Sequence, residues 1–150
     1  MENPPRNKSS APLPRMRRAV TIDTLRKAPD ISCLSYVGIK TVAATRFLAM
    51  SNRAGRDGLL ELLQRFSCIA TAKAFLSFAD AVGASWPDNV MVMQPCCKCL
   101  STDEFTLAKM AEAAIAGNRE GFSAVLDGFV RKDRHDRLYA LATDFVTVMQ

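Results

Sequence analysis

Pro95-Cys96-Cys97-Lys98-Cys99 places three of the five cysteines of this 150-residue chain within four positions. On both sides of this joint, apolar residues recur at steps of three and four, which is typical of amphipathic helices. The length suits one domain and a tail. We therefore predict an all-α fold, a compact bundle of about five helices interrupted by one cysteine-rich joint.

The segment before the joint contains two predicted helices and one extended run. Pro29-Asp30 predicts the entry to the first core helix, with Asp30 or Ser32 as its cap. Its inner face is formed by Tyr36, Ile39, Ala43, Phe47 and Met50. A second, longer helix is expected from Asp57 to about Val82. Val90-Met91-Val92-Met93 is too short for a helix and predicts a short strand or a buried extended link at residues 90–93.

After the joint, three more helices are expected. Ser101 and Glu104 have the spacing of a capping box, which predicts a helix start. Phe122, Val125, Leu126 and Phe129 have the i, i+3, i+4, i+7 spacing of a short amphipathic helix. The charged link at residues 131–137 leads to the last helix, with Asp133 as its predicted cap.

The N-terminal tail, residues 1–29, is predicted to be disordered, and the helical domain is predicted to span residues 30–150. Four prolines and few apolar residues lie within residues 1–19, so little burial offsets the entropy of ordering. Residues 1–30 contain seven Lys/Arg and three Asp/Glu, against thirteen and twelve in the remainder. The excess positive charge therefore belongs to the tail, where the basic cluster Arg15, Arg17 and Arg18 could contact nucleic acid or simply aid solubility.

Composition excludes some classes of protein. No apolar run approaches the ~18 residues that a membrane span needs, and no secretory signal is recognised. We therefore expect a cytoplasmic protein with reduced thiols. Five cysteines are an odd number, which does not indicate a disulfide framework.

Pro95-Cys96-Cys97 and Thr102-Asp103-Glu104 resemble the features of a family of small, uncharacterised bacterial proteins. Those proteins are helical and have a Pro-Cys-Cys element just before a Thr-x-Asp-Glu helix start. The resemblance covers roughly residues 31–145 and does not extend to Met91, Met93 or Cys99. It implies a helical fold in a bacterial protein of unknown function, and it implies no mechanism.

One hypothesis for the joint is a soft-metal site formed by five sulfur-bearing residues within nine positions: Met91, Met93, Cys96, Cys97 and Cys99. Thiolates and thioethers select Cu(I) over harder ions. Zn is less well served, because structural zinc sites use paired C-x₂₋₄-C elements and this chain lacks a second pair. In a second hypothesis, Cys97 or Cys99 is a redox thiol, since both precede a helix N-terminus that stabilises a thiolate.

A third interpretation treats these cysteines as packed and inert, because free cysteine is among the most buried residue types. The sequence favours this interpretation, with no cofactor, over any single ion. His135, the only histidine, is expected to be solvated, and the acids of both charged helix starts are explained as caps. No motif for a phosphate loop or a catalytic nucleophile is found, so the sequence leans against an enzyme.

The function predicted from the sequence is thus a small non-enzymatic binding or regulatory module with a structural or soft-metal-binding cysteine cluster. The alternatives are a thiol-redox protein and a nucleic-acid accessory protein that acts through its tail. The sequence does not identify a protein partner or an oligomeric state.

Overall fold

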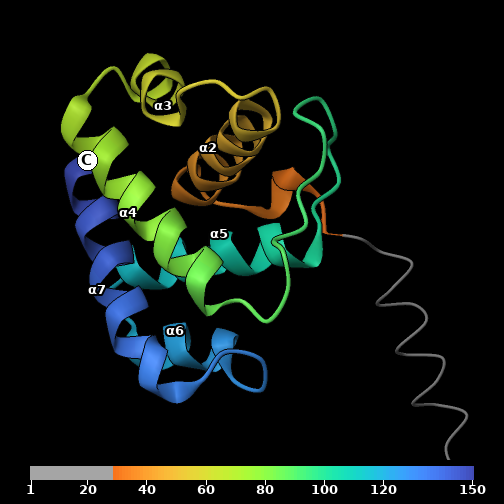
Figure 1. Cartoon of the computed structure of the whole chain (residues 1–150). Coiled ribbons are helices and arrows are strands. Elements are labelled where there is room, and N and C mark those ends of the chain that lie inside the picture. Colours follow the sequence, from red (N-terminus) through yellow and green to blue (C-terminus); the bar gives the residue numbers. More distant parts are fainter. Residues whose placement is uncertain (1–28) are drawn as a thin grey trace, which may run out of the picture.

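The computed structural model describes residues 29–150, and within them it confirms the all-α bundle (Figure 1). The described part contains one 3-10 helix and six α-helices: η1 (Ile31–Cys33), α2 (Tyr36–Arg53), α3 (Gly58–Phe66), α4 (Ile69–Ser85), α5 (Thr102–Ile115), α6 (Arg119–Leu126) and α7 (Lys132–Met149). The prediction of a disordered tail concerns residues that lie outside the described part, apart from Pro29. No described helix is long and apolar enough to cross a membrane.

The helices are arranged around α5, which contacts α2, α6 and α7, while α4 packs along α7 (Figure 1). An aromatic cluster forms the centre of the core between α4 and α7. The ring centroid of Phe145 lies 5.1 Å from that of Phe75 and 6.3 Å from that of Phe78. Each of these rings is almost fully buried, and burial of such a side chain stabilises the fold by about 1.5–3 kcal/mol.

The long second helix was predicted wrongly, because the chain breaks it into α3 and α4. Ser67 adopts a left-handed conformation with φ of 54°, and its amide donates to the carbonyl of Leu63 at 2.8 Å. Cys68 then occupies the N-cap position of α4. The break allows α3 to pack on α2 while α4 turns to pack on α7. Sequence periodicity did not reveal it, since no glycine or proline marks the turn.

The predicted inner face of the first helix was also wrong. The helix starts at Tyr36 and is capped by Ser35, whereas Asp30 caps η1. Tyr36 is 67% exposed, and Ile39 and Met50 are each 37% exposed. The buried face is instead formed by smaller or polar residues: Val37, Gly38, Thr41, Val42, Ala44, Arg46 and Ser51.

Close approach of α2 to α5 explains this choice of face. A Cβ added at Gly38 would lie 3.4 Å from the Cβ of Ala108 and 2.8 Å from Oε1 of Glu112. Glu112 also joins the two elements, because it accepts a hydrogen bond from the amide of Ser35 at 2.7 Å and pairs with Lys109 at 2.8 Å. Small residues on α2 are therefore required where the two helices meet.

The predicted starts of the helices after the sulfur-rich joint agree with the structure at α5 and differ from it at α7. The capping box of Ser101 and Glu104 is confirmed at the start of α5. The last helix begins two residues earlier than predicted, with Arg131 rather than Asp133 at the N-cap position. Of the two alternatives predicted for residues 90–93, a short strand or a buried extended link, the strand is absent and the segment is a link without regular secondary structure. Within residues 29–150 the only strand-like pairing is an isolated antiparallel bridge between Asp30 and Cys99.

Candidate functional site

The connection between α4 and α5 contains a sulfur-rich segment that we call the sulfur loop, residues 90–99. It runs outside the helices, beside α2 and the start of α5 (Figure 1). It has no regular secondary structure apart from the bridge at Cys99. Without helix or strand hydrogen bonds, the peptide N–H and C=O groups of this loop need side chains or other backbone groups as hydrogen-bond partners to hold one conformation.

A buried ion pair between Arg46 of α2 and Glu104 of α5 lies directly beneath the sulfur loop. The side chains are only 3% and 0% exposed. Nε of Arg46 lies 2.8 Å from Oε1 of Glu104, and its Nη2 lies 3.0 Å from Oε2. This two-point geometry is the strongest form of the contact, and the hydrogen bonds that Arg46 donates to Glu104 raise the pKa of Arg46 above its ordinary value. The guanidinium is therefore charged at neutral pH.

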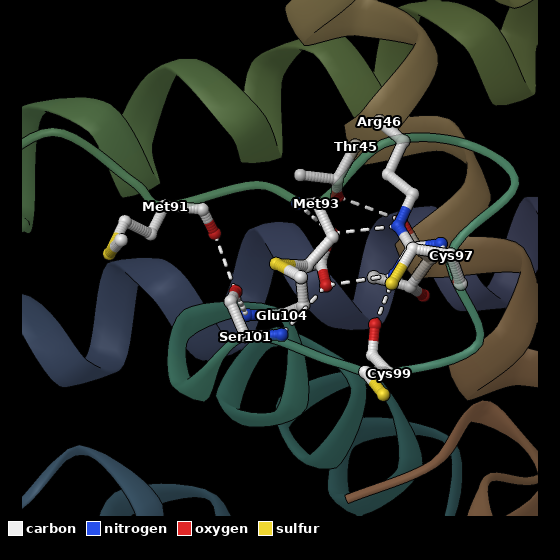
Figure 2. A network of polar contacts seen from close by, with 9 residues as sticks. Thr45, Arg46, Met91, Met93, Cys97, Cys99, Ser101 and Glu104 are labelled. Carbon is white, nitrogen blue, oxygen red and sulfur yellow. Dashed lines mark hydrogen bonds and ion pairs between the residues drawn. The ribbon is translucent and has the colours of Figure 1, made fainter. Parts of the chain in front are cut away.

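The remaining hydrogen-bonding capacity of this pair is used on the backbone of the sulfur loop (Figure 2). Arg46 donates from Nη1 to the carbonyl of Cys97 at 2.7 Å and from Nη2 to that of Cys99 at 2.9 Å. Glu104 accepts from the amide of Met93 at Oε1 and from that of Ser101 at Oε2, each at 2.9 Å. One ion pair thus fixes the sulfur loop both before and after its cysteines.

Asp103 in the first turn of α5 and the side chain of Ser101 hold the beginning of the loop. The amide of Met91 donates to Oδ2 of Asp103 at 2.7 Å, and the indole of Trp86 donates to Oδ1 at 3.1 Å. The hydroxyl of Ser101 donates to the carbonyl of Met91 at 2.6 Å (Figure 2). Asp103 and Glu104 were explained from sequence as caps alone, but both also bind the loop.

The far end of the sulfur loop is held by the chain that enters the domain. The amide of Ile31 donates to the carbonyl of Lys98 at 2.9 Å, and the amide of Leu100 donates to the carbonyl of Pro29 at 2.8 Å. Pro29, the last residue of the predicted tail, therefore contacts the helical domain through its carbonyl. The loop's backbone is fixed from three directions.

The sulfur side chains of the loop are exposed although its backbone is held. Cys96 and Cys99 are exposed and Cys97 is half-buried, and all three are free thiols. Met91 is 71% exposed and Met93 is 38% exposed. The expectation that the cysteines are packed is wrong for Cys96 and Cys99, because the loop buries peptide groups rather than side chains.

Two further expectations concern residues away from the loop. His135 was expected to be solvated and is instead 4% exposed, with its Nε2 lying 3.0 Å from the carbonyl oxygen of Val130. Its position on the inner side of α7 was hidden by the charged residues around it. Cys33 and Cys68 are exposed free thiols in other parts of the fold.

The five predicted metal ligands are not brought together as one group. In residues 29–150, no three side chains of His, Cys, Asp or Glu are grouped so that they could hold a metal ion. A hollow of about 330 Å³ does lie between the sulfur loop and α2, and its lining includes Met93 and Cys96 of the predicted set. Met50 of α2 lines the same hollow and was not predicted as a ligand.

Arg46 is the residue that sequence reasoning missed at this site. Its one signal is the position of a charged residue within the otherwise apolar or small run Val42-Ala43-Ala44-Thr45-Arg46-Phe47-Leu48-Ala49. A charge in such a run is buried only with a partner, since burial of an unpaired charge is very costly. The signal indicates that a partner exists but does not identify Glu104.

The chain was compared with protein families, with curated proteins and with solved structures, and none of them matches it. The resemblance to a bacterial helical family therefore stays a prediction. The functional argument rests on the geometry of the sulfur loop.

Proposed function

We propose that this chain is a non-enzymatic binding module whose binding element is the sulfur loop, and that the loop binds a soft metal ion of the Cu(I) class. One observation carries the proposal. A buried ion pair and a helix cap fix the loop's backbone, while its thiols and thioethers remain accessible.

The cost of the ion pair supports a role in positioning the loop. Desolvation of two charges costs several kcal/mol per ion, and a buried pair often stabilises a fold no more than apolar residues of similar volume would. Arg46 and Glu104 supply what apolar side chains lack, namely hydrogen bonds to four backbone groups of residues 93–101. A binding site whose backbone is already fixed loses less entropy when its ligand arrives.

The chemistry of the exposed groups supports the choice of ion. Thioether sulfur is a poor ligand for hard cations and a good one for Cu(I), and thiolate strengthens this preference. The loop contains both kinds of sulfur within residues 91–99. Zinc sites use thiolate, imidazole and carboxylate, so the two methionines would contribute nothing to a zinc site.

A second candidate function is thiol–disulfide exchange at Cys97. It is favoured by the fixed backbone at Cys97, whose carbonyl accepts from Arg46 at 2.7 Å, while the thiol of this residue is only half-buried. In the proposed step the thiolate attacks a low-molecular-weight disulfide, forms a mixed disulfide and releases one thiolate of that reagent.

The nucleic-acid hypothesis depends on residues 1–29 and stays a prediction, because almost all of them lie outside the described part. Removal of residues 1–28 should abolish salt-sensitive binding to DNA if the hypothesis holds. Binding that is unchanged by this truncation would place any nucleic-acid contact on the helical domain.

Anaerobic titration of the reduced full chain with Cu(I), in competition with a chromogenic Cu(I) chelator, tests the proposed function. Native mass spectrometry of the same samples gives the number of ions bound. We expect one bound Cu(I) ion, and we expect its binding to be lost when Cys96, Cys97 and Cys99 are all replaced by serine. The matched control replaces Cys33 and Cys68 by serine, which should leave binding unchanged.

Failure of the wild-type chain to compete with the chelator would reject the soft-metal function. The redox candidate is tested separately by alkylation at pH 6, where Cys97 should react faster than Cys33 of the same chain. Equal rates would count against a redox function.

A further inference from the structure

The hollow between the sulfur loop and α2 is lined by sulfur-containing residues from two segments that are distant in sequence. Met93 and Cys96 line it from the loop, and Met50 lines it from α2. Met50 is 37% exposed and Met93 is 38% exposed, so both side chains are partly accessible. The hollow measures about 330 Å³, so an ion can enter it from solvent.

The face of α2 that lines the hollow is set by helical spacing. Arg46, Ala49, Met50 and Arg53 follow the i, i+3, i+4, i+7 pattern of a single helix face. Arg46 fixes the loop from this face, and Met50 follows it by one turn. The contact that positions the loop therefore also sets its distance from Met50.

The position of Cys96 in the loop is defined by a turn. The amide of Cys97 donates to the carbonyl of Gln94 at 2.9 Å, and this bond closes a four-residue turn with Pro95 and Cys96 at its centre. Proline at the second position of a turn restricts φ and lowers the entropy that must be lost. Cys96 is thus held at the corner of the turn, on the lining of the hollow.

We propose that Met50, Met93 and Cys96 form a three-sulfur Cu(I) site in this hollow. The proposal rests on the soft-metal function proposed above and replaces the ligand set that the sequence suggested. On binding, the thiol of Cys96 loses its proton to solvent and its sulfur forms a bond to the ion, while the two thioethers each donate a lone pair. No oxidant or reductant takes part, and the copper remains Cu(I) throughout.

Charge at the hollow favours a monovalent ion bound to thiolate. One Cu(I) and one thiolate are together neutral, so the site adds no net charge. Arg46 is neutralised by Glu104, while Arg53 lies on the lining as a second cation. Because no carboxylate of the described part lines the hollow, it offers nothing to balance a divalent cation.

The other three predicted ligands are left out for structural reasons. Met91, Cys97 and Cys99 do not line the hollow. The carbonyls of Cys97 and Cys99 accept from Arg46, and the amide and carbonyl of Met91 are bound to Asp103 and Ser101. Figure 2 shows the contacts of Arg46 with the two cysteine carbonyls and of Ser101 with the carbonyl of Met91.

The test compares single variants of the reduced full chain by anaerobic Cu(I) competition. Met50→Leu and Met93→Leu remove one thioether each at nearly constant volume, and Cys96→Ser removes the thiolate. Each should weaken Cu(I) affinity by at least about tenfold, since even the loss of a group that supports a metal ligand costs about 10–100-fold. The matched controls Met91→Leu and Cys99→Ser change sulfur atoms of the same loop and should stay within about twofold of wild type, because neither is proposed as a direct ligand.

X-ray absorption on the loaded wild-type chain provides a second readout, with three sulfur neighbours expected around copper. Retention of full affinity by Met50→Leu, with loss in Met91→Leu or Cys99→Ser, would overturn this ligand set and leave the soft-metal function intact. Absence of Cu(I) binding by the wild-type chain would reject that function and this site together. Far-UV circular dichroism of each variant identifies any loss of binding that comes from unfolding.

Discussion

Replacement of Arg46 by methionine should lower the free energy of unfolding by about 3–5 kcal/mol, the range for removing one partner of a buried ion pair. The structure accounts for this magnitude. The variant loses two charge-assisted hydrogen bonds to Glu104, each typically worth about 1.5–3 kcal/mol. Glu104 stays fully buried and keeps only the amides of Met93 and Ser101 as donors. Methionine replaces most of the apolar stem of arginine, so loss of packing contributes little.

The measurement is urea unfolding at 25 °C, followed by far-UV circular dichroism and by fluorescence of Trp86, the only tryptophan. Coincident transitions by the two probes justify a two-state treatment. The matched control is Arg56→Met, which removes an exposed pair in which Nε of Arg56 lies 3.3 Å from Oε1 of Glu61. Exposed pairs of this kind contribute about 0–1 kcal/mol.

A second substitution separates the ion pair from its other contacts. Adding Glu104→Gln to Arg46→Met removes the buried unpaired charge while keeping a side chain that still accepts from backbone amides. The double variant should therefore recover part of the loss, with a coupling energy of at least about 1 kcal/mol between the two positions. If Arg46→Met costs no more than Arg56→Met, or if the coupling is zero, the reasoning about the buried pair is refuted.

Three further predictions concern contacts around this site. Partial burial alone would raise the pKa of Glu112, but hydrogen bonds from Lys109 and from the amide of Ser35 outweigh it and hold that pKa below its ordinary value. The ionised Glu112 therefore stabilises the fold above the unfolded pKa of about 4.3, and this contribution is lost as the pH falls through the lower folded pKa. In urea unfolding, the free-energy advantage of wild type over Glu112→Gln should shrink from pH 6 to pH 3, and a constant difference would contradict this assignment. Gly38→Ala should lower the free energy of unfolding by about 1–3 kcal/mol, because the added Cβ would meet Glu112. Gly83→Ala has open space around the added Cβ and should stabilise α4 by about 0.5–1 kcal/mol. Thermal unfolding measures both, and equal effects would refute the close approach of α2 to α5. Ser101→Ala should lower stability by about 0.5–2 kcal/mol through loss of the α5 cap, and a Tm equal to that of wild type would show that the cap contributes nothing.

Helix content and the start of α5 were predictable because they depend on local sequence. Ser101 and Glu104 are three residues apart, and a capping box is defined by that spacing alone. The break between α3 and α4 was not predictable in the same way. Ser67 takes a left-handed conformation that glycine usually provides, and tertiary packing of α4 on α7 determines it.

The inner face of α2 was misjudged because large apolar residues were assumed to point inward. At a close helix contact the buried positions belong to small residues, and Gly38 is one of them. The larger apolar side chains of Ile39 and Met50 are left partly exposed. Hydrophobicity alone does not distinguish these cases, since it gives no information about the distance between two helices.

The candidate site was located by the density of sulfur in residues 91–99, but its supporting residues were not. Arg46 is 51 and 53 positions from the two cysteines whose carbonyls it binds, and 58 positions from Glu104. Such long-range pairings are not encoded in any local spacing. The same holds for Met50, which reaches the hollow only because α2 passes beneath the loop.

The ion pair of Arg46 and Glu104 is better explained by the conformation of the sulfur loop than by stability alone. Two apolar residues could fill the same volume and stabilise the bundle about as well. They could not accept from the amides of Met93 and Ser101 or donate to the carbonyls of Cys97 and Cys99. Without those bonds the loop's peptide groups would turn to water, and its thiols would no longer keep fixed positions relative to α2. The buried charge pair therefore fixes the backbone of the segment that contains the sulfur atoms, which the proposed binding site requires and a simple connection between two helices does not.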